Sequence, residues 1–443
     1  MFDFATVFTS FGGFLWVMFF FILALSVVVA VHEYGHYIVG RWCGIHAEVF
    51  SVGFGSVLIS RVDRYGTRWQ IAALPFGGYV KFKADSNATS AQDGMVLNSL
   101  NQTELRSTMH GAPIWARAAT AAAGPAFNFI LSIVLFCTLF MWQGQFSDSL
   151  KINKMFNIPG EFTLELGDEI TAVNGLDVHN FGEFLLAGQD VKNFVTYTVK
   201  RKGKLVQAQG PVPFPALVYQ VQPRSAAIEA GILSGDVITH IDGQPIFKFA
   251  DLQSLVAAAD KDEMQFSIWR FGAKFDVVLR SKLVAIPGPN GSFESRRLVG
   301  ITGGTFFEPG TEPQSFIVAI KAAIERTWFI IKISLTGLKQ MVVGSISACN
   351  LSGPVAIAET AGQMASQGAL PFLALIAGLS TAVGLMNLFP IPILDGGHLV
   401  FCAYEAVTGR KPSDSVLQFL MTFGLIIVLS LTVFAVVMNQ ICP

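Results

Sequence analysis

Charged residues are scarce in this chain of 443 residues. They make up 14% of the sequence, against roughly 25% in an ordinary soluble protein, while hydrophobic residues reach 52%. Acidic and basic residues nearly balance, at 31 and 30, so the basic excess typical of nucleic-acid-binding proteins is missing. The five cysteines lie far apart and include no CxxC pair, which argues against a zinc ribbon and against a disulfide scaffold. This composition argues against a soluble enzyme and against a disordered chain.

Four apolar runs have about the 20 residues that a helix needs to cross a bilayer. They cover residues 4–31, 118–142, 370–394 and 416–438. Lysine and arginine are absent from both terminal tails, but they occur between the first two runs and between the last two. By the positive-inside rule, we expect those two connecting segments to be cytoplasmic. Both termini and the long segment 143–369 are then expected outside.

Residues 46–83 follow the first run and contain short, roughly alternating stretches broken by glycine. This pattern is typical of β-hairpins, and we expect them near the cytoplasmic face of the membrane. The alternative is a small sheet that only covers neighbouring loops.

The outside segment contains an internal repeat. Residues 167–175 (GDEITAVNG) match residues 235–243 (GDVITHIDG), which indicates tandem domains. The second copy, with AAIEAGILSGDVITHIDGQPI at 226–246, resembles a bacterial-type PDZ domain. A PDZ groove binds extended peptide by strand addition, and the alternative is a spacer whose groove is closed.

Residues 313–345 predict a helix with a narrow charged face. The charged side chains repeat at helical spacing, at Lys321, Glu325, Lys332 and Lys339. Such a helix is suited to lying in the membrane interface. Packing of the same helix onto the repeats is the alternative.

Residues 32–36, His-Glu-Tyr-Gly-His, form an HExxH motif directly after the first apolar run. At i and i+4 on a helix, His32 and His36 lie on one face and can share one zinc ion. Glu33 is then placed to act as general base toward the attacking water. Ionisable residues at membrane depth are costly and indicate function. The alternative is two buried histidines beside a chance glutamate.

A catalytic zinc site needs a third protein ligand, and Asp395 is the leading candidate. It ends the third run, within NLFPIPILDGGH (387–398), where two prolines prevent a regular helix. The predicted topology puts Asp395 on the same side of the membrane as the HExxH motif. His398 is a rival ligand, and a role of Asp395 as a helix cap is the other alternative.

HExxH in one run and NxxPxPxLDG in another together resemble the site-2 protease family of intramembrane zinc proteases. The tandem repeat makes the chain most similar to the regulator of sigma-E protease type of Gram-negative bacteria. The segment 123–128 (AGPAFN) in the second run also resembles that family. Within this segment we interpret Gly124 and Asn128 as helix-packing residues, because small side chains let helices approach.

The resemblance implies a zinc metalloendopeptidase with one Zn²⁺ per chain. It assigns His32, His36 and Asp395 as the metal ligands and Glu33 as the catalytic base. The glutamate is intact, so the chain is expected to be active.

The resemblance also implies a substrate-binding region. Asn387 is expected to contact the substrate backbone near the scissile bond, with helix–helix hydrogen bonding as the alternative. The family's membrane re-entrant β-loop is similar to Gly77, Gly78, Tyr79 and Val80. This segment is expected to offer a strand edge that holds an unwound substrate.

The implied partners are the lipid bilayer and single-span membrane proteins, namely an anti-sigma factor shortened outside and remnant signal peptides. Nucleic acid is not expected as a partner. The PDZ pair is expected to act as a size gate for substrates. The implied location is the bacterial inner membrane, with both termini and the PDZ domains in the periplasm and the active site near the cytoplasmic side.

The predicted fold is a polytopic α-helical membrane protein with four transmembrane helices, a cytoplasmic-side β segment, and two tandem PDZ-like (α+β) domains outside. The predicted parts are: helix 1 with HExxH, 1–42; the β-hairpin or re-entrant region, 43–112; helix 2, 113–143; the PDZ-like domains, 144–213 and 214–308; the amphipathic helix and connector, 309–369; helix 3 with NxxPxPxLDG, 370–404; and helix 4 with its preceding loop, 405–443.

Two other functions remain open at this point. One is a membrane-bound zinc peptidase whose site lies in a soluble compartment. The other is a non-enzymatic PDZ receptor or scaffold of the cell envelope.

Overall fold

The computed structural model describes residues 4–84, 100–146, 149–187, 194–259, 261–287, 293–347 and 353–441. Part of the predicted hairpin region, residues 85–99, therefore lies outside the described residues. The chain divides into two compact units. We call them the helical unit, which comprises residues 1–139, 316–342 and 351–442, and the β unit, which consists mainly of residues 140–315.

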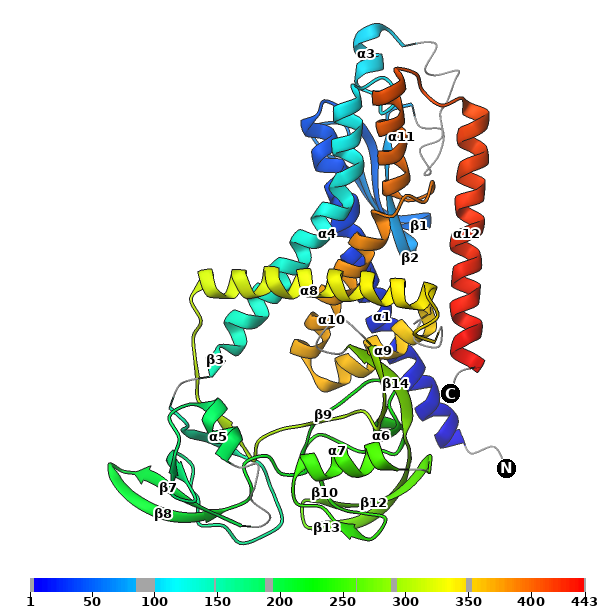
Figure 1. The fold of residues 1–443 in the computed structure, drawn as a ribbon. Coiled ribbons are helices and arrows are strands. Elements are labelled where there is room, and N and C mark those ends of the chain that lie inside the picture. The colour runs from blue at the N-terminus through cyan, green and yellow to red at the C-terminus, as the bar shows by residue number, and fades with distance from the viewer. Residues whose placement is uncertain are drawn as a thin grey trace. The chain divides into compact units, whose positions relative to one another are not determined.

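Four helices in the described residues are long and apolar enough to cross a membrane, which confirms the predicted number of spans. They are α1 (Phe4–Trp42), α4 (Ile114–Gln143), α10 (Ala369–Asn387) and α12 (Asp414–Ile441) (Figure 1). Together with the extensive β structure, these helices define a polytopic membrane protein with β domains. The shorter helices of the helical unit are α3 (Gln102–Arg106), α8 (Phe316–Val342), α9 (Pro354–Gln367) and α11 (Asp395–Thr408).

Two of the spans differ from the predicted bounds. Helix α1 does not stop at residue 31 but continues to Trp42, so the HExxH motif lies inside it. Helix α10 ends at Asn387 instead of 394, because two prolines interrupt the segment that follows.

Helix α1 packs against α9 and α10 through a cluster of apolar side chains. Ala24 and Val28 of α1 are fully buried there, together with Phe372 and Ile376 of α10. This packing fixes α1 beside the helix that leads toward Asp395.

Small side chains form the buried face of α4, namely Ala116, Thr120, Ala121, Ala123, Gly124, Pro125, Asn128 and Ser132. They allow a close approach of α1, since a Cβ atom added to Gly35 would lie 2.6 Å from the carbonyl oxygen of Ala123. Small residues at helix crossings are the usual basis of packing between membrane helices.

Hydroxyl groups connect α4 with α8 and α10. The Ser132 hydroxyl lies 2.6 Å from that of Thr381 in α10 and 3.3 Å from that of Thr327 in α8. Ser380 of α10 donates to the backbone carbonyl of Asn128, at 2.8 Å. Each such bond in a membrane protein contributes about 0.6 kcal/mol on average, so the bonds orient the helices more than they stabilise them.

Helix α8 runs across α4 and α10 within the helical unit (Figure 1). Its buried residues are Ala319, Ala323 and Thr327. Lys321 and Glu325 lie on the exposed side. The predicted helix with a charged face is therefore present, and its buried side contacts other helices of this unit.

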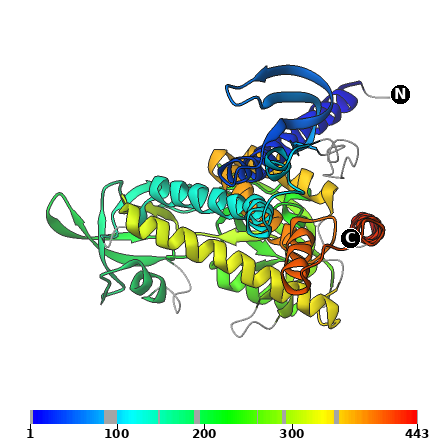
Figure 2. The same ribbon diagram turned by 90° about the horizontal axis from the view of Figure 1, so that it is seen from above.

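Strands β1 (Ala47–Val62) and β2 (Arg68–Phe82) form the predicted hairpin beside α1 (Figure 2). Both strands bend, and β1 does so at Gly53 and Gly55, which have positive φ angles. Residues 49–52 pair with 78–81 on one side and with 68–71 on the other. Residues 57–62 pair with 68–72, so the segments 57–62 and 78–82 are the two edges of the folded hairpin.

The β unit contains two four-stranded sheets of the same strand order, β6-β5-β7-β8 and β11-β10-β12-β13. The first comprises β5 (Glu169–Val173), β6 (Leu176–Asp177), β7 (Val195–Arg201) and β8 (Lys204–Gly210), with helix α5 (Phe181–Ala187). The second comprises β10 (Val237–Ile241), β11 (Gln244–Pro245), β12 (Glu263–Arg270) and β13 (Ala273–Arg280), with helix α7 (Phe249–Ala258).

A buried ion pair occurs at the same place in both sheets. Asp168 and Asp236 are each 1% exposed, and they accept hydrogen bonds from Arg201 and Arg270 at 2.7 Å. Hydrogen bonds from the Arg201 guanidinium hold the pKa of Asp168 below its usual range. The sequence repeat is thus matched by a repeated sheet and a repeated ion pair.

The remaining elements of the β unit are short. They are β3 (Gln145–Phe146), β4 (Ile152–Met155), β9 (Val218–Val221), α6 (Ala226–Glu229), β14 (Lys282–Pro287), β15 (Phe293–Leu298), β16 (Ile301–Gly303), β17 (Phe307–Pro309) and β18 (Thr311–Glu312).

A single segment, residues 299–309, contributes to both sheet cores. Its strand β16 pairs with β9, and Val299 lies in the core of the second sheet. Its strand β17 pairs with β4, and Phe306 and Phe307 lie in the core of the first sheet. The two sheets therefore share this segment. The boundary predicted at residue 213 and the PDZ assignment stay predictions.

Candidate metal centre

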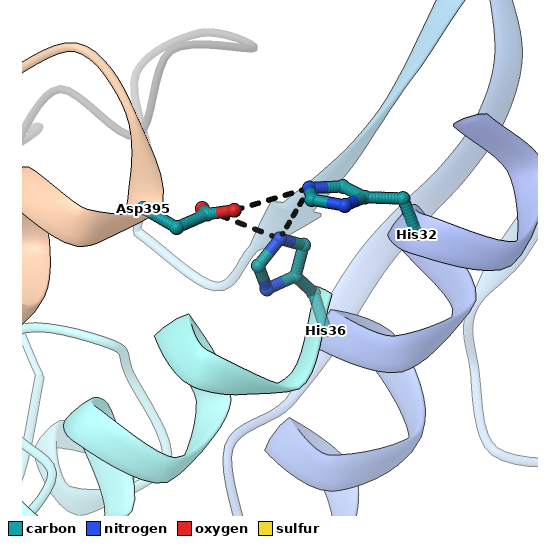
Figure 3. Close-up of side chains that lie close together, drawn as sticks. All are labelled: His32, His36 and Asp395. Atoms are coloured by element: carbon teal, nitrogen blue, oxygen red, sulfur yellow. Dashed lines mark hydrogen bonds and ion pairs between the residues drawn. The ribbon is translucent and has the colours of Figure 1, made fainter. Parts of the chain in front are cut away.

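Helix α1 presents His32 and His36 on one face, as the HExxH spacing predicts. Their Nε2 atoms lie 3.2 Å apart, and both rings point toward Asp395 (Figure 3). The sequence allows a regular helix here because the motif contains no proline, and Gly35 faces α4, where a side chain would clash.

Asp395 reaches the two histidines from the start of α11. Its Oδ2 atom lies 3.1 Å from His32 Nε2, and its Oδ1 atom lies 3.3 Å from His36 Nε2. The chain between α10 and α11 is not helical, and it folds closely over the first turn of α11. Added Cβ atoms on Gly396 and Gly397 would lie 2.3 Å and 2.5 Å from backbone carbonyl oxygens of this connection. The DGG sequence therefore places the aspartate.

The three side chains fit a zinc ion. Tetrahedral coordination at about 2.0–2.1 Å separates ligand atoms by roughly 3.3 Å, close to the separations found here. The donor set of two imidazole nitrogens and one carboxylate is that of a catalytic zinc site, which leaves a position for water or substrate. The Oδ2 atom of Asp395 is buried and accepts no hydrogen bond from the described residues, as expected for a metal ligand.

His398, the rival ligand, is not part of this cluster in the described residues. Its ring packs edge-on against Phe401. Asp395 is the first residue of α11, and the N-cap position belongs to Leu394. Neither alternative to Asp395 as a ligand is therefore supported.

Glu33 lies beside the edge segment 78–82 of the hairpin. A Cβ atom added to Gly78 would be 3.3 Å from Glu33 Cγ and 2.7 Å from the carbonyl oxygen of Ser51. The backbone amide of Val80 also interacts with the Glu33 carboxylate. The structure thus brings the proposed base next to two of the four hairpin residues that the sequence singled out, while Gly77 and Tyr79 flank them in the same strand.

Asn387 is the last residue of α10 and is half-buried. Its side chain forms no hydrogen bond with the described residues, so the predicted alternative of helix–helix bonding is not observed there. Its contact with substrate stays a prediction.

Sequence reasoning missed the part that α4 plays in the site. Gly124 is not only a packing residue, because an added Cβ would lie 2.3 Å from His36 Nε2 and 2.7 Å from His32 Nε2. Asn128 approaches His32 Nδ1 at 3.1 Å, and the Thr120 carbonyl oxygen lies 2.8 Å from His36 Nδ1. The available signal was the spacing of Thr120, Gly124 and Asn128 at i, i+4 and i+8, which places all three on one helix face.

Two ligands from an HExxH helix and a third carboxylate, assembled among membrane-crossing helices, define a zinc metallopeptidase centre of the intramembrane class. The sequence pattern of Peptidase family M50 matches residues 20–431. The chain belongs to this family, the site-2 proteases.

Named relatives agree with this assignment. The chain is 32% identical to the Regulator of sigma-E protease RseP of Escherichia coli (strain K12), over 95% of this chain and 97% of the relative. It is 30% identical to RseP of Salmonella typhimurium (strain 14028s / SGSC 2262), over 94% and 96%. A relative from Brucella suis biovar 1 with the provisional name of a zinc metalloprotease is 34% identical, over 92% and 91%.

The protein is thus a zinc metalloprotease of the site-2 class, with Zn²⁺ as its cofactor. The non-enzymatic scaffold considered from the sequence is not supported.

Proposed function

We propose that this protease hydrolyses peptide bonds within single-span transmembrane segments. The observation that carries the proposal is the position of the ligands. His32 and His36 lie inside a helix that is long and apolar enough to cross the membrane, and Asp395 follows another such helix after a short connection. A site built this way meets its substrates within the bilayer. This position argues against the alternative of a peptidase site in a soluble compartment.

The residue roles follow from the geometry. His32, His36 and Asp395 would hold zinc, which when bound supplies Lewis-acid polarisation of the scissile carbonyl and of the attacking water. Glu33, adjacent to His32 on α1, takes a proton from that water as the peptide carbonyl is attacked. Glu33 then returns the proton to the leaving nitrogen, which completes hydrolysis.

The edge segment 78–82 is the proposed docking strand for substrate. A helical substrate hides its carbonyl groups in internal hydrogen bonds and must unwind before cleavage, and strand addition holds it extended. The segment pairs with β1 on one side only, and it lies against Glu33. Asn387, without a bonding partner among the described residues, is proposed to steady the substrate backbone.

The relatives suggest the physiological setting. Because they are named as regulators of sigma-E, we assign this chain a membrane-tethered anti-sigma factor as substrate, together with remnant signal peptides. The proposed location is the bacterial inner membrane, with both termini and the β unit in the periplasm and the zinc centre near the cytoplasmic side. The two repeated sheets are proposed to be PDZ-like domains that exclude substrates with bulky outside portions.

Substitution of Glu33 by glutamine tests the proposed function. The change preserves size and removes the base, so we expect unchanged zinc content and a loss of cleavage of about 10²–10⁴-fold. The assay uses the purified full chain in proteoliposomes with a single-span substrate, and mass spectrometry locates the cut. Cleavage only outside the span by the unsubstituted enzyme, or an active Glu33→Gln enzyme, contradicts the proposal.

Proline in the edge segment tests strand addition. Tyr79→Pro or Val80→Pro removes one backbone N–H, so cleavage of a stable helical substrate is expected to fall. A substrate with glycine or proline near its scissile bond should suffer less, because it needs less unwinding. The matched control is Leu58→Pro, in the opposite edge segment 57–62, which should spare both substrates.

If proline at 79 and 80 leaves both substrates unaffected, or if Leu58→Pro is equally harmful, the hairpin acts only as a cover. Zinc content of each variant shows whether the metal centre has survived the substitution.

Excision of the β unit tests the size gate. Residues 145–146 of β3 pair with 311–312 of β18, so the chain ends left by removal of 147–310 lie side by side and a short Gly/Ser linker can join them. The shortened enzyme should cleave a short single-span substrate normally and also accept one with a bulky outside domain. Equal loss of both cleavages, with zinc retained, would rule out a purely excluding role.

A further inference from the structure

The two histidines of the metal centre have different partners on α4. The Nδ1 atom of His36 lies 2.8 Å from the backbone carbonyl oxygen of Thr120. A carbonyl oxygen only accepts hydrogen bonds, so His36 carries a proton on Nδ1 and directs the lone pair of Nε2 toward the metal position. The backbone of α4 thus prepares His36 as a ligand.

His32 has a side-chain partner instead. Its Nδ1 atom lies 3.1 Å from the amide nitrogen of Asn128. Asn128 is fully buried, and its Oδ1 atom has no hydrogen-bond partner among the described residues. An unpaired buried acceptor costs about 1–3 kcal/mol, so this amide oxygen calls for a functional explanation.

We propose that Asn128 is a positioning residue for zinc, which holds His32 in the tautomer that binds the metal through Nε2. With Nε2 bound to metal, Nδ1 carries the proton and needs an acceptor. A half-turn of the Asn128 amide exchanges its two ends and presents Oδ1 to that N–H. The otherwise unpaired oxygen then accepts the bond from His32.

The surroundings of Asn128 fit a fixed position for this side chain. Ser380 of α10 donates to the Asn128 backbone carbonyl at 2.8 Å. A Cβ atom added to Gly384 would lie 3.1 Å from Asn128 Cβ, so α10 packs closely over the residue. The amide can turn about its own bond, but the residue cannot move away from His32.

This role goes beyond the ligand set, and its failure is separable from failure of the proteolytic function, because zinc binding is measured without substrate. Partners of metal-bound histidines typically change metal affinity 10–100-fold when removed. Zinc affinity of the full chain in detergent, measured by competition with a chelator, is therefore the first test. The variants are Asn128→Leu, Asn128→Asp and the control Ser132→Ala.

Asn128→Leu removes the acceptor at similar volume, so we expect zinc affinity to fall 10–100-fold. Asn128→Asp keeps an acceptor and should bind zinc within a few-fold of the unsubstituted protein. Ser132→Ala lies one turn further on α4 and removes a buried interhelical hydrogen bond without touching a histidine, so it should leave zinc affinity unchanged. Equal affinity in Asn128→Leu, or equal loss in Ser132→Ala, would overturn the proposal.

The second measurement does not depend on the folding of Asn128→Leu. In ¹⁵N-histidine NMR spectra of the zinc-loaded protein, one protonated Nδ1 resonance should move when Asn128 is replaced by Asp, because its acceptor becomes charged. The Nδ1 resonance of His36, bonded to the Thr120 carbonyl, should stay in place. If no protonated Nδ1 resonance responds to Asn128→Asp, Asn128 does not accept the His32 proton and the proposal is wrong.

Discussion

The zinc centre depends on the convergence of three side chains from two distant parts of the chain. His32 and His36 share one helix, so their separation follows from helix geometry alone. Asp395 must be brought to them by tertiary structure, and its two oxygens lie 3.1 Å and 3.3 Å from the two histidines. The proline-broken connection after α10 and the glycines at the start of α11 make this approach possible. Polar ligands among membrane helices are costly unless they are paired or bind metal, and here they have each other.

Helix α4 is the scaffold on which this arrangement rests. Its small residues admit α1, and Gly124 leaves the space next to both Nε2 atoms free of any side chain. Thr120 and Asn128, one turn to either side of Gly124, contact the outer nitrogens of the two histidines. The ligand helix is therefore held from behind, and its orientation depends on residues that do not touch the metal position.

Much of the site was predictable because its residues interact locally or carry a specific pattern. HExxH spacing predicts a shared face for His32 and His36, and the prolines before Asp395 predict the end of a helix. The contribution of α4 was not predictable with the same certainty, because small residues at helical spacing are usual in any packed membrane helix. The folding of the hairpin into four segments and the burial of Phe306 and Phe307 in the first sheet core also escaped the sequence, since both depend on pairing between distant residues.

The most direct test of the metal centre is the zinc content of four purified proteins. We expect one zinc per chain in the unsubstituted protein and in His398→Ala, because His398 lies outside the ligand cluster. Zinc binding should be sharply weaker in Asp395→Ala, which lacks a ligand, and in Gly124→Ala, whose Cβ would enter the metal position. Full zinc occupancy in Asp395→Ala, or its loss in His398→Ala, would contradict the assignment of His32, His36 and Asp395 as the zinc site.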